Sequence, residues 1–262
     1  MRGGCLSAAA VLRARRRLHR GASAGEPLPD WALRCRPVCA TTERELEQWL
    51  ACLPPAGSGS PAPGLRAVLA RRQRFGHGQR GRAWQSPAGG VWLSAALPWP
   101  PEASAALPLA AAVGLALELE PLGLPVRLKW PNDLLVHGRK IAGLLPRLRR
   151  RGAAVRWAQV GVGLNGRNRG PAGAISVAEA LPAGVAAPPP ALLAARVLRG
   201  LEWTAAHALA PQRVWREARQ RLLLPEQPIL QGGEIWQALD LEADGALRLR
   251  CGERFSRLER LF

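Results

Sequence analysis

Two lysines, an aspartate and an asparagine lie together in the stretch from Lys129 to Lys140. These are the only lysines in the chain, since every other one of its 37 lysine and arginine residues is an arginine. A lysine is a compact point charge that can approach a single phosphate or carboxylate oxygen, whereas arginine presents a broad planar fork. Asn132 and Asp133 are also of types that are rare in this chain. The count alone is equally compatible with chance, but the surrounding pattern favours an anion-binding site.

That pattern is a small antiparallel meander. Apolar and basic residues alternate over 126–130, with the period of a half-buried strand, and residues 131–133 (Pro-Asn-Asp) form a turn. A second short strand over 134–136, a His-Gly turn at 137–138 and a third apolar run over 141–145 follow. We expect this unit to place Lys129, Asp133 and Lys140 near a common edge.

A second candidate for anion binding is the segment 71–90, RRQRFGHGQRGRAWQSPAGG, which is rich in arginine and glycine and has no acid. It lies between two predicted strands, 65–70 and 91–97. Backbone N–H groups and basic side chains of such a loop can wrap around an anion. The segment lacks the spacing of a Walker loop and of a dinucleotide-binding fingerprint. A solvated basic hairpin is equally compatible with it.

The remaining pattern predicts alternating helices and strands. A helix begins near Thr41 or Thr42, with Glu45 as the acid of a capping box, and 54–64 is a flexible surface loop. A buried helix is predicted over 103–122, a strand over 157–164, and two helices over 191–209 and 211–222. Short strands follow over 229–262, with a hairpin turn at Asp244-Gly245.

Composition bounds the class of protein. Hydrophobic residues make up 48% of the 262 residues, as in a globular protein, and the net charge is +18. The bias towards alanine, arginine, glycine and proline resembles a GC-rich coding preference, so we favour that origin of the charge over a nucleic-acid partner. The five scattered cysteines indicate reduced thiols in the cytosol. No apolar run has the length that a bilayer requires.

The motifs resemble those of a known family. RQRFGHGQRGRAWQSPAGGVWLSAAL, followed by KWPNDLLVHGRKIAGLL, is similar to the bacterial biotin protein ligases, also called biotin–[acetyl-CoA-carboxylase] ligases. The resemblance continues through VGVGLN at 160–165 and into LLLPEQPILQGGEIWQALDLEADGALRL near the end of the chain. It begins near Leu33. The region before it has no room for a helix-turn-helix, so the resemblance is to the non-repressor subgroup.

The resemblance implies an α/β (α+β) fold of the biotinyl/lipoyl-transferase type, with a mixed, mostly antiparallel sheet and helices. We expect three regions: a basic, disordered extension over 1–28, a catalytic domain over 29–222 and a small SH3-like β-barrel over 223–262. It also implies a cytoplasmic protein that has no membrane partner.

The activity that the resemblance implies is ATP-dependent biotinylation. Biotin is activated as biotinyl-5′-AMP with ATP and Mg²⁺, and is then transferred to a lysine of the biotin carboxyl carrier protein of acetyl-CoA carboxylase. A lipoate or octanoate transferase of the same fold is the alternative enzyme. A basic nucleic-acid-binding protein, whose binding would depend strongly on salt, is the alternative from another class.

The resemblance also assigns roles to individual residues. It assigns catalysis to Lys140, Lys129 and Asp133, and Asp133 is also the expected metal ligand. Biotin binding falls to Thr41, Thr42, Gln73, Gly76, His77, Gly78, Gln79, Lys140 and Gly143. Binding of ATP and the adenylate falls to Arg80, Arg82, Trp84, Asn132 and Asn165.

Four positions depart from the family pattern. Glu43 stands where the family commonly has asparagine, and Arg147 stands where it commonly has glutamate. His77 and Gln79 occupy places where arginines often hold the adenylate, with Arg80 and Arg82 as candidate substitutes. None of these departures touches Lys129, Asp133 or Lys140.

Overall fold

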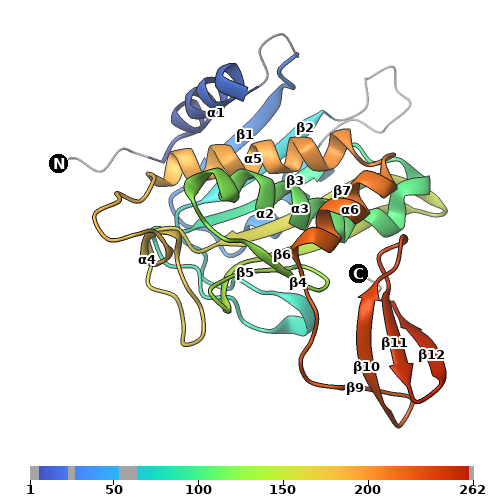
Figure 1. The fold of residues 1–262 in the computed structure, drawn as a ribbon. Coiled ribbons are helices and arrows are strands. Elements are labelled where there is room, and N and C mark those ends of the chain that lie inside the picture. Colours follow the sequence, from blue (N-terminus) through green and yellow to red (C-terminus); the bar gives the residue numbers. More distant parts are fainter. Residues whose placement is uncertain (1–5, 23–26, 53–63, 260–262) are drawn as a thin grey trace.

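The computed structural model describes residues 6–22, 27–52 and 64–259 of the chain. Its centre is an eight-stranded sheet with the order β1-β2-β3-β7-β6-β5-β4-β8 (Figure 1). The strands are β1 (Trp31–Arg36), β2 (Leu65–Ala70), β3 (Val91–Leu97), β4 (Arg127–Lys129), β5 (Asp133–Val136), β6 (Arg139–Arg151), β7 (Ala154–Leu164) and β8 (Leu222–Leu223). The β1–β2 and β4–β8 pairs are parallel and the other pairs are antiparallel. The predicted mixed, mostly antiparallel sheet is therefore confirmed.

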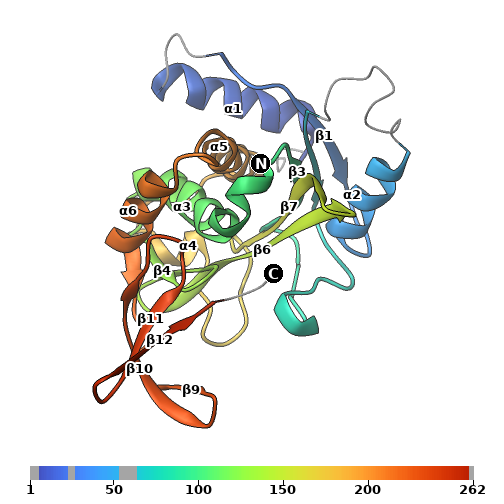
Figure 2. The same cartoon turned by 90° about the vertical axis from the view of Figure 1, so that its right-hand side faces the viewer.

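Helices cover both faces of this sheet. The larger helices are α1 (Ala8–Ala22), α2 (Thr42–Ala51), α3 (Leu107–Leu119), α5 (Pro190–Ala206) and α6 (Pro211–Arg221), and α4 (Val177–Ala180) is a single turn. Helices α3, α5 and α6 pack together on one face, and α2 lies on the other (Figure 2). Alternate residues of a strand point to opposite faces. Accordingly Ala67 and Leu69 of β2 face the main core, whereas Val68 packs against α2.

The N-terminal helix α1 is part of the packed fold. It lies against α5, with Val11 fully buried and Arg15 only 3% exposed. The Arg15 guanidinium binds the carboxylate of Glu202 on α5, and Trp31 Nε1 donates to that carboxylate at 2.8 Å. A buried charge needs a partner of opposite sign. The expectation of a disordered extension was therefore wrong for residues 8–22. One of the arginines in this segment forms a buried ion pair, which the composition alone does not reveal.

Helix α2 begins where the capping pattern predicts. The hydroxyl of Thr41 accepts a hydrogen bond from the backbone N–H of Arg44 at 3.0 Å. Glu45 does not complete a capping box. Its carboxylate instead accepts from Arg36 of β1 at 2.8 Å, which ties the helix to the edge strand. The loop predicted over 54–64 lies almost entirely outside the described residues.

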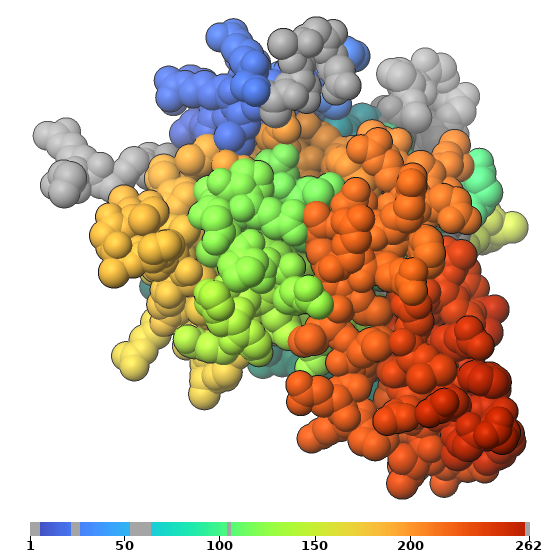
Figure 3. Space-filling model, in the orientation of Figure 1, coloured from blue at the N-terminus to red at the C-terminus, as the bar shows by residue number. Residues whose placement is uncertain are grey.

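The C-terminal residues form a separate four-stranded antiparallel sheet, with the order β12-β11-β10-β9. Its strands are β9 (Ile229–Gln231), β10 (Glu234–Leu241), β11 (Leu247–Cys251) and β12 (Arg254–Leu258). Figure 3 shows this part as a lobe at one corner of the molecule. Trp130 Nε1, from the turn after β4, donates to the carbonyl of Gly245 in the turn between β10 and β11 at 2.9 Å. The indole thus joins the lobe to the predicted anion-binding meander.

None of the helices formed by residues 6–22, 27–52 and 64–259 combines the length and the apolar character needed to span a bilayer.

Candidate functional site

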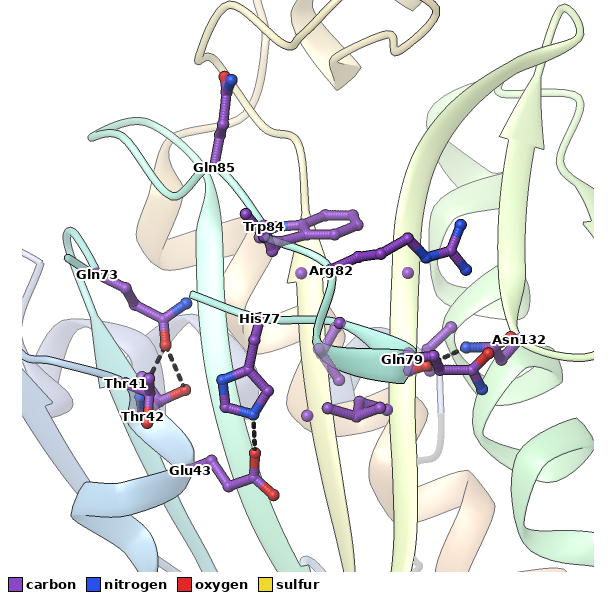
Figure 4. Close-up of a pocket in the computed structure, with 18 of the residues that line it drawn as sticks. Thr41, Thr42, Glu43, Gln73, His77, Gln79, Arg82, Trp84, Gln85 and Asn132 are labelled. Carbon is purple, nitrogen blue, oxygen red and sulfur yellow. Dashed lines mark hydrogen bonds and ion pairs between the residues drawn. The ribbon is translucent and has the colours of Figure 1, made fainter. Parts of the chain in front are cut away.

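A cavity of about 340 Å³ opens over the middle of the large sheet. Its walls come from segments far apart in the sequence: the start of α2, the segment after β2, the turn between β4 and β5, and strands β3, β6 and β7. Figure 4 shows Thr42 and Gln73 on one side of the cavity and Asn132 on the other. The two sides differ in chemistry, so a ligand with a neutral polar end and an anionic end would be held in one direction.

The first side carries a network of neutral polar groups, beside the carboxylate of Glu43 (Figure 4). Gln73 Oε1 accepts from the backbone N–H of Thr42 at 2.7 Å and lies 3.1 Å from its hydroxyl. Gln73 Nε2 donates to the hydroxyl of Ser86 at 2.9 Å, and the hydroxyls of Thr42 and Ser94 lie 2.9 Å apart. Buried polar groups are costly to leave unpaired, so this network holds its members in fixed positions. Such a wall suits an uncharged ligand group that both donates and accepts.

The other side carries a lysine held by two neighbours. Lys140 Nζ lies 2.7 Å from Asp133 Oδ1 and 4.9 Å from the centre of the Trp84 ring. The register of β5 and β6 brings these two residues near each other. Lys140 lies opposite Leu135, which is two residues along β5 from Asp133, and Asp133 lies opposite Gly143. The lysine side chain is 34% exposed, so it can meet a ligand without leaving its partners. A preorganised cation at this point can stabilise negative charge on a carboxylate or phosphate.

The indole of Trp84 lies on a platform of two glycines. Gly143 of β6 and Gly163 of β7 are direct neighbours across the sheet. A Cβ at Gly163 would lie 2.5 Å from the ring, and one at Gly143 would lie 3.0 Å from it. Only glycine therefore lets the ring lie flat against the two strands. Trp84 Nε1 is buried and has no hydrogen-bond partner among the described residues.

The basic segment after β2 folds into a hairpin, residues 76–84, at the mouth of the cavity. Gly78 N donates to the carbonyl of Arg82, and Trp84 N donates to that of Gly76, both at 2.8 Å. A short 3-10 turn (Gln79–Gly81) forms the tip. The expected basic loop is thus an ordered element, with Trp84 at its base and His77 on its first strand.

Most of the residues singled out by the sequence line this one cavity. They are Thr41, Thr42, Gln73, His77, Gly78, Gln79, Arg82, Trp84, Asn132, Asp133, Lys140, Gly143 and Asn165. Gly76 and Arg80 belong to the hairpin but not to the cavity wall. Lys129 lies exposed on β4, in register with Asp133, and likewise does not line the cavity.

Several lining residues were not predicted as site residues. Ser94, on the buried strand β3, and Gly161 and Gly163, on β7, face the cavity, as does Glu43 in the first turn of α2. The alternation of β3 predicts a buried strand but gives no reason to single out one serine. Glu43 did carry a signal, because it departs from the family pattern. Its carboxylate binds His77 and Arg147, two other positions that depart from that pattern.

Residues 59–165 match the family described as the biotin/lipoate A/B protein ligase family. Among curated relatives, the biotin–[acetyl-CoA-carboxylase] ligase of Paracoccus denitrificans is 40% identical over 123 residues, which are 44% of this chain and 51% of the relative. The enzyme of the same name from Mycobacterium tuberculosis is 34% identical over 155 residues, 56% of each chain. The chain thus spans about half the length of these curated relatives. The resemblance seen in the motifs is confirmed over residues 59–165, which match this family.

Solved structures share the fold over a greater length. A biotin protein ligase from Aquifex aeolicus in complex with biotin and ATP has a TM-score of 0.69 and 22% identity, and the match covers 89% of this chain and 97% of that one. A biotin protein ligase from Leishmania major in complex with biotinyl-5-AMP has a TM-score of 0.60 and 21% identity, with 89% and 100% covered. At this level of identity the likeness establishes the fold.

Proposed function

From the family domain at residues 59–165 and the two-sided cavity, we propose that this protein is an ATP-dependent biotin protein ligase. It activates biotin as biotinyl-5′-AMP and transfers the biotinyl group to a lysine of the biotin carboxyl carrier protein of acetyl-CoA carboxylase. The observation that carries the proposal is the pairing of a neutral polar wall with a lysine in one cavity. Biotin has the matching chemistry, a urea ring at one end and a carboxylate at the other.

The neutral wall would bind the ureido ring. A urea offers two N–H donors and a carbonyl acceptor, and each such group left unpaired on burial costs about 1–3 kcal/mol. Thr42, Gln73 and Ser94 offer hydroxyl and amide groups that can satisfy both kinds. Thr41, Gly78 and Gln79 line the same cavity. Gly76 is not part of the cavity wall, and its carbonyl accepts from Trp84 N at 2.8 Å within the hairpin.

Lys140 would stand where the two anions meet. In the first step a carboxylate oxygen of biotin attacks the α-phosphorus of ATP, and the bond to the pyrophosphate oxygen breaks. In the second step a lysine amine of the carrier attacks the acyl carbon, and AMP leaves. Neither step needs an enzyme nucleophile, so the protein acts by holding the reactants together and by stabilising charge. The charge and position of Lys140, next to Asp133 and Trp84, suit this role.

The nucleotide would lie towards Asp133, Asn132 and Asn165, with Arg82 and Arg80 of the hairpin as further cations. Among the described residues no three His, Cys, Asp or Glu side chains gather to hold a metal ion. Mg²⁺ commonly keeps several waters and binds through one or two carboxylates together with substrate phosphates. The single carboxylate of Asp133 fits a magnesium ion that arrives with ATP. Lys129 would act on the phosphate side only at longer range.

The proposed domain division lies close to where the two sheets separate, although Leu223 of β8 still pairs with Lys129 in the large sheet. The catalytic unit would end near residue 222, and the C-terminal lobe would begin at 223. The carrier domain would approach the open side of the cavity, because its lysine must reach the acyl carbon beside Lys140.

Exchange of labelled pyrophosphate into ATP tests the first step without a carrier protein. We expect exchange that depends on both biotin and Mg²⁺. Parallel reactions would contain lipoate or octanoate, the substrates of the other branch of the family. Exchange with lipoate or octanoate but not with biotin would assign the protein to that other branch. No exchange with biotin, lipoate or octanoate would refute the proposal.

A further inference from the structure

The carboxylate of Glu43 connects helix α2 to the hairpin at the mouth of the cavity. Glu43 lies in the first turn of α2, and its side chain is only 12% exposed. Its Oε2 lies 2.6 Å from Nε2 of His77, on the first strand of the hairpin (Figure 4). Since a carboxylate only accepts, the histidine must carry a proton on Nε2. The contact is therefore a charge-assisted hydrogen bond between two elements that both line the cavity.

Three further side chains hold Glu43 in place. Its Oε1 lies 2.8 Å from Arg147 Nη1 and 3.3 Å from Arg149 Nη2, both on β6, and 3.1 Å from Gln159 Nε2 on β7. A carboxylate that is removed from water must be paired, and here two guanidinium groups supply the opposite charge. The sheet thus fixes one carboxylate oxygen, and the other is left to hold His77.

The hairpin has two strands, and each has one side chain that attaches it to the rest of the fold. On the second strand, Trp84 lies on the glycine platform formed by Gly143 and Gly163. On the first strand, His77 pairs with Ala83 through the backbone and reaches Glu43 with its side chain. Without the histidine contact, the nearest remaining ties between the first strand and the start of α2 would be those of Gln73 and Phe75, just before the hairpin. A hairpin held less firmly opens more often, and each opening breaks the backbone hydrogen bonds within it.

We propose that Glu43 and His77 form a latch that fixes hairpin 76–84 over the cavity, with Arg147 and Arg149 as the charges that anchor it. Both latch residues are positioning residues, because they act by setting the place of the hairpin. The kinetic consequence rests on the proposed biotin ligase function, whereas the effect on the hairpin itself does not. Three departures from the family pattern are explained together, because His77 and Arg147 both bind Glu43.

Hydrogen exchange of the purified full-length chain tests the latch without any substrate. The reporters are the backbone amides of Gly78 and Trp84, which close the hairpin. We expect His77→Phe, which keeps a ring but removes the donor, to speed their exchange about tenfold or more, as loss of a charge-assisted hydrogen bond requires. His77→Gln, which restores an N–H donor of similar reach, should return the exchange to within about threefold of wild type.

Glu47 supplies a matched control one turn further along α2. It also binds Arg149 and Gln159, but it makes no contact with the hairpin. Glu43→Ala should therefore speed exchange at Gly78 and Trp84, whereas Glu47→Ala should not. Equal exchange in His77→Phe and wild type, or an equal effect of the two glutamate variants, would overturn the latch.

The kinetic arm separates the two proposals. If the wild type exchanges pyrophosphate with biotin, His77→Phe should raise the KM for biotin about tenfold and change kcat less, because only part of the population has the hairpin in place. His77→Gln should recover most of that loss. An unchanged KM alongside faster hydrogen exchange would refute the functional role of the latch. A wild type without exchange activity, but with the hydrogen-exchange differences intact, would refute the ligase proposal and leave the latch standing.

Discussion

Substitution of Gly163 by alanine should displace the indole that forms one wall of the cavity. A Cβ at this position would lie 2.5 Å from Cε2 of Trp84 and 2.7 Å from both Cζ2 and Nε1. Non-bonded carbon atoms settle at about 3.5–4.0 Å, so the ring must retreat by roughly 1 Å. The φ of Gly163 is not positive, so alanine causes no backbone strain and the whole effect is steric.

The expected cost follows from the limited room. Overpacking of a well-filled site commonly costs about 1–3 kcal/mol, and the upper half of that range applies because three ring atoms are met at once. The ring also lies 4.9 Å from Lys140 Nζ, so its displacement should disturb the lysine and lower the rate of biotin-dependent exchange about tenfold or more. Gly161→Ala is the matched control, since its nearest contact is Leu145 Cβ at 3.3 Å.

A double-mutant cycle isolates the contact. The free energy of unfolding would be measured by urea denaturation for wild type, Gly163→Ala, Trp84→Ala and the double variant. With the ring removed, the alanine at 163 meets no indole, so the cycle should give a coupling energy of about 1 kcal/mol or more between the two positions. Equal destabilisation by Gly163→Ala in the presence and absence of the ring would refute the platform.

Three further predictions concern single side chains. Lys140→Arg should lose about 10²–10³ of the exchange rate despite its retained charge, because a planar fork does not fit the place of a compact ammonium; near-normal turnover would contradict this. Arg15→Ala should lower the free energy of unfolding by about 3–5 kcal/mol, because it leaves the carboxylate of Glu202 largely buried without its cation. Arg17 is exposed, so Arg17→Ala should change the free energy of unfolding by less than about 0.5 kcal/mol in the same urea titration. Burial raises the pKa of the Cys39 thiol from 9.0 to about 11, so between these pH values the unfolded chain holds fewer protons than the folded one. The unfolding free energy should therefore fall as the pH rises from 9 to 11, and Cys39→Ala should flatten that part of the profile.

Local patterns predicted the elements well because they depend on neighbouring residues. The meander is present as β4, β5 and β6, and its two turns lie where the sequence places them. Strand β6 is longer than predicted, since it runs to Arg151 through a basic stretch. Its polar residues interact with α2 and β7, which a periodicity argument over a few residues does not include.

Contacts between distant parts of the chain could not be predicted in the same way. Glu43 meets Arg147 and Gln159, which follow it by 104 and 116 residues, and no local pattern encodes that meeting. The same holds for Arg15 and Glu202, 187 residues apart. In a chain with so many arginines, composition gives no sign of which one is buried. The cluster of Lys140 and Asp133 was predictable because one short meander contains both.

The hydrogen bond from Trp130 to Gly245 limits how this protein can diverge. The donor adjoins the turn that carries Asn132 and Asp133, and the acceptor is a carbonyl in the turn between β10 and β11. This contact does not depend on the side chains of that hairpin turn, because a backbone oxygen is the partner. The contact does depend on the length of the turn, because an insertion or deletion would move the carbonyl away from the indole. Among descendants of this sequence, we therefore expect the loop 242–246 to keep its number of residues, and to keep glycine at 245, where φ is 92°.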